Sequence, residues 1–240
     1  MSILPVAADL SEIDVDFNFF DDTPDGKDPD SHSPTLRRYH QLLWSKELPD
    51  GRLFNLESRK SLSPYLVYQS ETQRFVLGSD TIATRHRTKL SSLFAATPSE
   101  ETEAFLRRSY TICGFIVFPV SRGSINQRRG THPKIQDRWD LTLESIRRYY
   151  DGGVSPLTEV LEREAAFFDL FGSFEGYVTH FHLDDFVFPG GAVRFILPFA
   201  DFTGPTLPTD VTSYREYLQQ SLALFTARRD RLQRIVRGHA

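Results

Sequence analysis

The 240-residue sequence contains a single cysteine, Cys113, which lies in the apolar stretch YTICGFIVFPV. One cysteine excludes an intramolecular disulfide and a zinc site built from cysteine pairs, so we expect a cytoplasmic protein. Catalytic thiols need accessible and electropositive surroundings. We therefore interpret Cys113 as a buried strand residue and not as a nucleophile.

Long apolar runs and recognised catalytic motifs are also missing. No stretch reaches the roughly 18 apolar residues that a membrane span needs, so we expect no membrane association. The start, MSILPVAADLSEIDVDF, lacks a basic region and does not fit a secretory signal. Neither a Walker loop, a dinucleotide fingerprint nor a G-x-S-x-G nucleophile elbow is present. The formal net charge of −4 means that any nucleic-acid surface must be a local patch.

Patterns of apolar residues, caps and turns predict many helices and a few strands out of strict alternation. We expect an α+β fold: a small mixed or antiparallel sheet with a buried central strand, packed by several helices and a long C-terminal helix. Residues 1–12 are predicted to be a flexible arm and 13–240 a single domain. Strands are predicted at 65–69, 74–78, 110–119 and 192–199. Helices are predicted from Ser33, over 80–95 and 99–107, from 131–133 to 150, over 155–171 and 174–186, and over 210–237.

Positive charge is concentrated after the strand predicted at 110–119. Five cationic side chains fall within seventeen residues, with Asp137 as the one carboxylate among them. We expect the segment RRGTH, residues 128–132, to lie at a helix N-terminus, where free N–H groups and the helix dipole favour anions. Arg128, Arg129, Thr131 and His132 are the predicted ligand-binding residues, and His132 and Asp137 the catalytic candidates. The alternative is that these arginines pair with the acidic segment 9–30.

That acidic segment carries nine carboxylates. It starts like a calcium-binding loop but has His32 where a bidentate Glu belongs. Asp28 and Asp30 are the candidates for a looser Mg²⁺ site, and a solvated acidic loop is the alternative. The helix that follows places Arg37 and His40 where they could face a cleft and bind a ligand. An isolated histidine is more often a structural residue.

Two stretches, DPDSHSPTLRRYHQLLWSKELPDGRLFNL and INQRRGTHPKIQDRWDLTLESIRRYY, resemble an uncharacterised family of bacterial proteins, and VRFILPF fits the same pattern. The resemblance covers about residues 14–230. It implies a single-domain bacterial protein and carries no activity, cofactor or catalytic residue.

Three functions follow from these features. The first is binding of a phosphate-bearing small molecule or nucleic acid at the arginine-rich segment, with or without catalysis. The second is a non-catalytic interaction module, in which the acidic N-terminal loop and the basic C-terminal helix bind a protein partner or join a homo-oligomer. The third is nucleic-acid binding through the arginines that end the last helix. We favour the first, because polar residues concentrated at the junction of a strand and a helix need an explanation.

Overall fold

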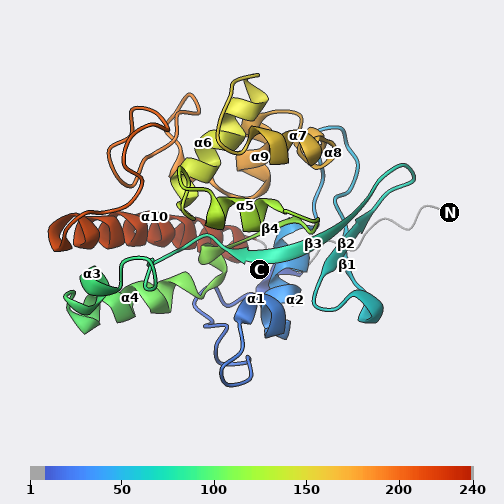
Figure 1. Ribbon diagram of the computed structural model, residues 1–240. Helices are drawn as coiled ribbons and strands as arrows, with labels where there is room; N and C mark the ends of the chain where they lie inside the picture. The colour runs from blue at the N-terminus through green and yellow to red at the C-terminus, as the bar shows by residue number, and fades with distance from the viewer. Residues whose placement is uncertain (1–8, 239–240) are drawn as a thin grey trace.

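The computed structural model describes residues 9–238, and its centre is a four-stranded antiparallel sheet (Figure 1). The strands neighbour one another in the order β1-β2-β3-β4, as they do in sequence. The predicted α+β class is therefore confirmed, with every strand pair antiparallel. The strands are β1 Leu56–Ser58, β2 Leu66–Gln69, β3 Arg74–Thr81 and β4 Phe115–Pro119.

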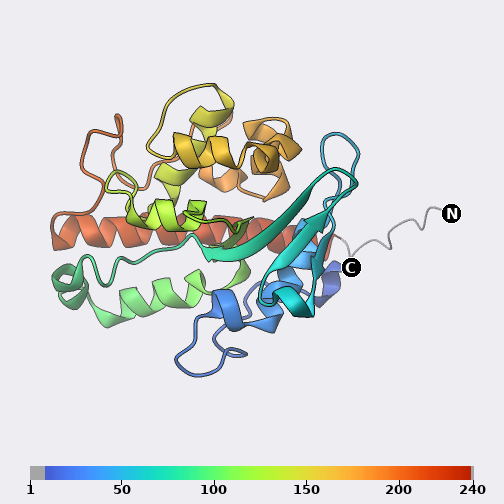
Figure 2. The same cartoon turned by 45° about the vertical axis from the view of Figure 1, so that its right-hand side comes forward.

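Helices cover the sheet and extend beyond it. In Figure 1, α5 to α9 lie above the sheet and α1 and α2 below it. Figures 1 and 2 both show the long α10 running between α5 and α4. The helices are α1 Pro29–His32, α2 Pro34–Trp44, α3 Ser91–Ala95, α4 Ser99–Ser109, α5 Ile125–Thr131, α6 Trp139–Tyr150, α7 Thr158–Arg163, α8 Ala165–Phe168, α9 Phe174–His180 and α10 Val211–Arg237. Short 3₁₀ helices are Leu10–Glu12, Lys60–Leu62, Ile112–Gly114, Asp169–Phe171 and Asp184–Phe186.

Local capping explains why two of the predicted helices begin where they do. The Ser33 hydroxyl accepts the backbone N–H of Leu36 at 3.0 Å, and Pro34 is the first residue of α2. At the start of α10, the Asp210 side chain accepts the N–H of Ser213 at 2.8 Å in a reciprocal capping box. Such caps satisfy N–H groups that have no partner within the helix.

The core lies between the sheet and the covering helices, and aromatic rings fill much of it. Phe54 is fully buried, with its ring centroid 4.8 Å from that of Tyr68 on β2. Phe171 of the 3₁₀ helix Asp169–Phe171 and Phe167 of α8 lie 5.9 and 6.5 Å from the Phe54 ring. Edge-to-face packing of this kind accounts for the phenylalanine content without assigning it a function.

Strand β4 is buried as predicted but is not central. All five of its residues are buried, although it is the last strand in the sheet order. At its start, the Arg228 guanidinium from α10 donates hydrogen bonds to the carbonyl oxygens of Cys113 at 2.9 Å and Phe115 at 3.1 Å. The Arg228 side chain therefore supplies hydrogen-bond donors to backbone carbonyl oxygens that a neighbouring strand would otherwise satisfy.

The helix predicted over 80–95 is wrong for most of its length. Asp80 and Thr81 continue β3 and pair with Ile116 and Phe115 of β4. An irregular segment follows, in which His86 has a φ of 50°, outside the helical region. Helix α3 begins only at Ser91. Long-range strand pairing overrides the local helical pattern here.

The strand predicted at 192–199 is also wrong. Only Val193 makes an isolated bridge, with Val187, across a tight turn. Gly190 and Gly191 adopt φ angles of 95° and 83°, which only glycine adopts readily. Further along, the backbone N–H of Ile196 donates to a carboxylate oxygen of Asp140 at 2.9 Å, so it is unavailable to a neighbouring strand.

Most of the predicted arm at 1–12 lies outside the residues that the structure describes. Residues 1–8 lie outside the described residues, whereas Leu10–Glu12 form a 3₁₀ helix with Leu10 buried. Within residues 9–238, no helix combines the length and apolar composition that crossing a membrane requires.

Candidate functional site

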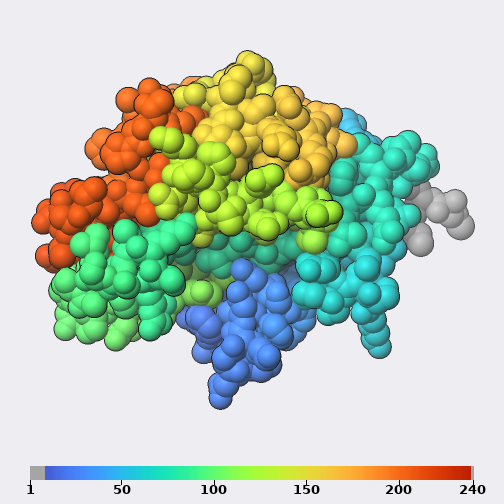
Figure 3. All heavy atoms as spheres, in the orientation of Figure 1, coloured from blue at the N-terminus to red at the C-terminus, as the bar shows by residue number. Residues whose placement is uncertain are grey.

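A polar cavity of about 390 Å³ lies where β3 leaves the sheet. We call it the acidic cavity. Its walls come from α1, the irregular segment after β3, the end of α4 and Asp137. Figure 3 shows the blue N-terminal segment, which includes α1, projecting beside the green residues of α3 and α4. Segments far apart in sequence thus supply one site.

Two aspartates form the carboxyl wall. Asp30 on α1 accepts hydrogen bonds from the Thr81 hydroxyl at 3.2 and 3.3 Å. The pKa of Asp30 is raised to about 8, first by burial and then by the negative charges of Asp80 and Asp28. Burial also raises the pKa of Asp80, to about 6, although Arg129 opposes the shift. At neutral pH, Asp30 is therefore mainly protonated and Asp80 mainly ionised.

Arg129 holds the carboxylates in place from behind this wall. Its side chain is 1 % exposed, and one Nη lies 2.6 Å from a carboxylate oxygen of Asp80 and 3.0 Å from one of Asp137. The same nitrogen donates to the carbonyl oxygen of Thr81 at 3.2 Å. The buried charge of Arg129 is thus already paired, and ligand binding by Arg129 stays a prediction.

Asp137, a predicted catalytic residue, does line the cavity. It has a φ of 69°, and its N–H donates to the carbonyl oxygen of Arg129 at 2.7 Å. Its carboxylate accepts a hydrogen bond from the Thr84 hydroxyl at 3.0 Å. A left-handed backbone costs energy and persists where surrounding contacts enforce it, often at functional sites.

His86 was not predicted, because it fell inside the incorrectly predicted helix. It lines the cavity, is 4 % exposed and also has a positive φ. Among the described residues, neither ring nitrogen has a hydrogen-bond partner. Burial lowers the pKa of His86 to about 4, so the ring is neutral at neutral pH. Buried polar atoms are normally satisfied, so the two unpartnered ring nitrogens of His86 are an exception at the cavity wall.

Two tyrosines of α10 fix the segment that carries His86. The Tyr214 hydroxyl donates to the carbonyl oxygen of Arg85 at 2.6 Å, and the Tyr217 hydroxyl to that of Thr84 at 2.7 Å. The Tyr217 ring also lies 5.3 Å from the imidazole of His86. The segment has no regular secondary structure, yet its backbone is tied to the longest helix.

Cations line the rest of the acidic cavity. Arg85 and Arg87 lie over the Phe94 ring, with guanidinium carbons 5.4 and 5.5 Å from its centroid. The Lys89 ammonium donates to the carbonyl oxygen of Gly130 at 2.8 Å. None of these three has a carboxylate partner within residues 9–238. The cavity therefore combines a carboxyl wall with cations free of ion pairs.

The segment RRGTH does not lie at a helix N-terminus. Residues 128–131 end α5, which begins after Ser124, and His132 is its C-cap. The left-handed Gln136 and Asp137 keep the helix from starting before Trp139. A helix C-terminus carries the negative end of the dipole, so the predicted anion site loses its physical basis.

The remaining residues of that stretch lie outside the cavity. Arg128 is exposed, and the Thr131 hydroxyl donates to the Gln127 carbonyl oxygen at 2.8 Å. His132 accepts the Lys134 N–H at 3.2 Å, and burial followed by the charge of Arg128 lowers its pKa. Internal pairing explains the buried arginines, but their partners are not in segment 9–30.

Arg37 and His40 do not reach the cavity either. Arg37 donates to the carbonyl oxygen of Ser31 at 3.3 Å. His40 is fully buried, where one ring nitrogen accepts the indole N–H of Trp44 at 2.7 Å and the other lies 2.9 Å from the Ser79 hydroxyl. Burial lowers the pKa of His40 to about 3. These contacts are those of a structural histidine, and ligand binding by His40 stays a prediction.

The predicted metal ligands Asp28 and Asp30 both line the cavity. Asp28 caps α1, accepting the N–H of Asp30 at 3.1 Å. Within the described part of the chain, no group of three or more histidine, cysteine, aspartate or glutamate side chains is placed to hold a metal ion.

Residues 13–232 match a family of unknown function, DUF6994. The chain belongs to this family. The uncharacterised family expected from the sequence is thereby confirmed, and the match covers both the acidic cavity and the sheet. Neither the curated proteins nor the solved structures include a match to this chain.

Proposed function

We propose that the protein binds a phosphate-bearing small molecule in the acidic cavity and acts on it by acid–base chemistry. The observation that carries this proposal is the pair Asp30 and Asp80, two neighbouring carboxyl groups whose pKa values are raised to about 8 and about 6. Paired groups with separated pKa values are typical of catalytic acids and bases.

The charged groups around the cavity indicate which chemical groups the ligand carries. Arg85, Arg87 and Lys89 favour an anionic group, and guanidinium groups bind phosphate oxygens through paired N–H donors. The carboxyl wall repels that group and accepts hydrogen bonds from hydroxyl or amino groups instead. A sugar phosphate or a nucleotide carries both features, at opposite ends of one molecule.

The two aspartates take different roles in proton transfer. Protonated Asp30 donates a proton to the leaving group, and ionised Asp80 accepts one from the attacking water or hydroxyl. General acid–base catalysis of this kind contributes about 10²- to 10⁴-fold in rate. Arg129 is a positioning residue, since it fixes Asp80 and Asp137 without facing the ligand. The neutral ring of His86 is available to accept or donate one further hydrogen bond.

Thermal unfolding with inorganic phosphate, sugar phosphates, nucleotides and short RNA or DNA tests the proposal, each with and without Mg²⁺. A ligand present at 100 times its Kd stabilises the folded state by about 2.7 kcal/mol. We expect stabilisation by a small phosphate-bearing compound, lost in Arg85→Gln/Arg87→Gln and retained in the exposed control Arg107→Gln. Arg128→Gln is a second control, because it removes a predicted ligand residue outside the cavity.

Several outcomes would contradict this function. Stabilisation that survives Arg85→Gln/Arg87→Gln but disappears in Arg128→Gln would move the site to the end of α5. Stabilisation by nucleic acid alone would identify a different ligand class. No response to any phosphate-bearing compound would remove the proposal. Turnover lost in Asp30→Asn with binding retained would support the acid–base step.

The alternative, an interaction module using the acidic loop and the basic helix, has less support. Asp16 from the acidic segment pairs with Arg108 at 2.7 Å and with Arg229 of α10. Arg231 pairs with Asp185 at 2.8 Å. These charges are already used within the chain, so a partner would have to displace them. A protein partner, a homo-oligomer, a cytoplasmic location and a bacterial origin stay predictions.

A further inference from the structure

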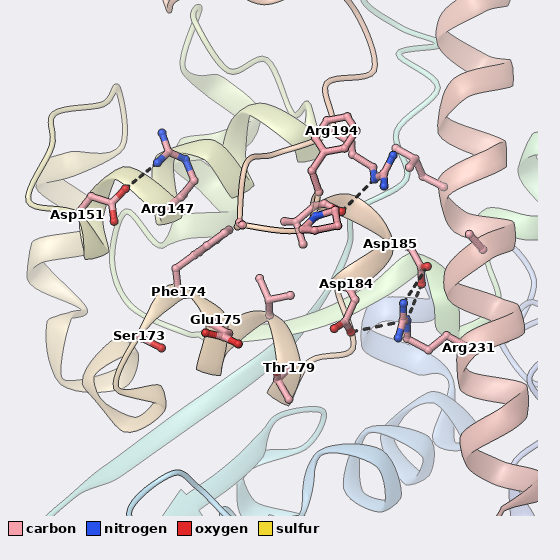
Figure 4. Close-up of a pocket in the computed structure, with 18 of the residues that line it drawn as sticks. Arg147, Asp151, Ser173, Phe174, Glu175, Thr179, Asp184, Asp185, Arg194 and Arg231 are labelled. Atoms are coloured by element: carbon pink, nitrogen blue, oxygen red, sulfur yellow. Dashed lines mark hydrogen bonds and ion pairs between the residues drawn. The ribbon is translucent and has the colours of Figure 1, made fainter.

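A second cavity, of about 1070 Å³, lies between α9, α10 and the turn at 187–193 (Figure 4). We call it the apolar cavity. It shares no lining residue with the acidic cavity. Its volume is that of sites for small organic molecules, which are usually apolar with a few well-placed polar groups.

Apolar side chains from three elements line this cavity. Phe174 and Val178 come from α9, Val187 from the turn and Leu224 from α10. On α10, Ala223 and Ala227 lie one helical turn apart, and their small side chains leave the space open. Burial of an apolar ligand body here would remove carbon surface from water, at about 25 cal/mol per Å².

Most charged groups of the apolar cavity are already paired. Arg147 lies 2.8 Å from a carboxylate oxygen of Glu144 and 2.6 Å from one of Asp151. Arg231 contacts Asp185 in the same way, as the dashed lines in Figure 4 show. A ligand anion gains little from arginines whose carboxylate partners would have to be displaced.

Arg194 differs from these two arginines. Its Nε donates to the carbonyl oxygen of Val187 at 3.0 Å, and its guanidinium carbon lies 4.1 Å from the centroid of the Phe188 ring. Within residues 9–238, neither Nη atom has a hydrogen-bond or ion-pair partner. The guanidinium is therefore held in a fixed plane with two parallel donors unused, the geometry that a carboxylate accepts.

The turn at 187–193 fixes this arrangement. The N–H of Phe188 donates to the carbonyl oxygen of Ala192 at 2.7 Å, and Gly190 and Gly191 close the turn with positive φ. Phe188 remains 47 % exposed. An exposed aromatic ring next to an apolar cavity offers further area to a ligand.

We propose that the apolar cavity binds a small molecule that carries a carboxylate on an apolar body. The carboxylate takes the two free Nη donors of Arg194, and the body lies against Phe174, Val178 and Leu224. The site is independent of the acidic cavity. Figure 4 places Glu175 at the opposite side of the cavity from Arg194, and Glu175 also has no ion-pair partner in the described chain. A ligand with an ammonium group, such as an apolar amino acid, would use both.

Titration calorimetry with a matched set of probes tests this site: 3-phenylpropionate, L-phenylalanine, 2-phenylethylamine and phenyl phosphate. We expect 3-phenylpropionate to bind and 2-phenylethylamine not to bind. In Arg194→Gln the carboxylate should bind roughly tenfold or more weakly, because a charge-assisted pair is lost. Arg194→Lys keeps the positive charge but not the two parallel N–H donors. Its affinity for the carboxylate should lie between those of the wild type and Arg194→Gln. The exposed Arg107→Gln is the unaffected control.

A variant that leaves Arg194 untouched guards against indirect effects. Ala227→Phe fills the cavity from α10 and should abolish binding while the Arg194 contacts persist. Tighter binding of L-phenylalanine than of 3-phenylpropionate, lost in Glu175→Gln, would identify the amino acid as the ligand class. Equal binding of the two would identify the simple acid.

Three results would overturn the proposal. One is the absence of binding by both carboxylate probes at millimolar concentration. Another is binding that neither Arg194→Gln nor Ala227→Phe weakens. The third is a preference for phenyl phosphate over 3-phenylpropionate, since it would mean that the two Nη donors of Arg194 bind a phosphate group.

Discussion

Two buried arginines, Arg129 at the wall of the acidic cavity and Arg228 in the core, have opposite surroundings. Arg129 lies between the carboxylates of Asp80 and Asp137. Arg228 is fully buried and donates to carbonyl oxygens only, those of Cys113, Phe115, Phe181 and His182. Carboxylates titrate and carbonyls do not. The pairing of Arg129 therefore depends on pH, whereas the hydrogen bonds of Arg228 do not.

The pKa values of the two guanidinium groups follow this difference. Burial lowers the pKa of Arg228 to about 10, with no ion-paired carboxylate to oppose it. Burial acts on Arg129 in the same direction, but the charges of Asp137 and Asp80 outweigh it and raise its pKa. Arg194 represents a third case, with a guanidinium fixed in place and two donors unused.

The largest loss of stability is expected for Arg228→Met. Arg228→Met leaves four carbonyl oxygens without this donor. At about 1–3 kcal/mol for each buried acceptor, we expect a total loss of at least about 4 kcal/mol. Chemical denaturation measures it. The loss should be the same at pH 5 and pH 8, because the carbonyl partners do not titrate. The exposed Arg234→Met on the same helix is the control, expected within about 0.5 kcal/mol of wild type.

A smaller and pH-dependent loss is expected for Arg129→Met. At pH 8 the variant leaves Asp80 and Asp137 without their cation, at a cost of about 2–3 kcal/mol. At pH 5, Asp80 is mainly protonated in the wild type as well, because its pKa is about 6. The loss should therefore shrink as the pH falls. Equal losses at both pH values would show that Arg129 and Arg228 play the same structural role.

Asp30→Asn is expected to stabilise the protein at high pH. The pKa of Asp30 is raised from 3.8 to about 8. Between these values the folded state holds a proton that the unfolded chain has released, so stability falls as the pH rises from about 4 to 8. Asparagine removes this dependence. At about 1.4 kcal/mol per pKa unit, this shift corresponds to a gain of up to about 5 kcal/mol at pH 8 and none at pH 4. The slope of unfolding free energy against pH is the measurement.

The smallest effect on stability is expected for His86→Asn. The imidazole makes no hydrogen bond in the described chain, and asparagine tolerates the φ of 50° at this position. Because the ring is buried and packs against Tyr217, the free energy of unfolding should fall by about 1 kcal/mol, the typical cost of a point substitution. Binding of the phosphate-bearing ligand should weaken clearly in calorimetry. A large loss of stability would mean that the unpartnered ring is a packing residue.

The sequence identified three residues of the acidic cavity, although it placed them in two separate sites. Asp28 and Asp30 were predicted as metal ligands and Asp137 as a catalytic residue, and all three line the cavity. Asp80 and His86 were missed, because residues 80–95 have a helical pattern in isolation. No local signal marks either residue, since their burial depends on α1, β4 and α10, which lie far away in the chain.

By itself, the sequence determined the elements whose signals are local. The Ser33 cap, the hairpin of β2 and β3, helix α4 and the Asp210 cap of the amphipathic α10 depend on residues within a few positions of one another. Only the tertiary structure decided which charges are free. Within the basic stretch at 122–138, Arg129 and Arg138 are buried in ion pairs. The other three cations there, like Arg85, Arg87 and Arg194, have no ion-pair partner in the described chain. The physical reason is that the burial and pairing of a charge depend on groups brought near it by folding, which local propensity does not encode.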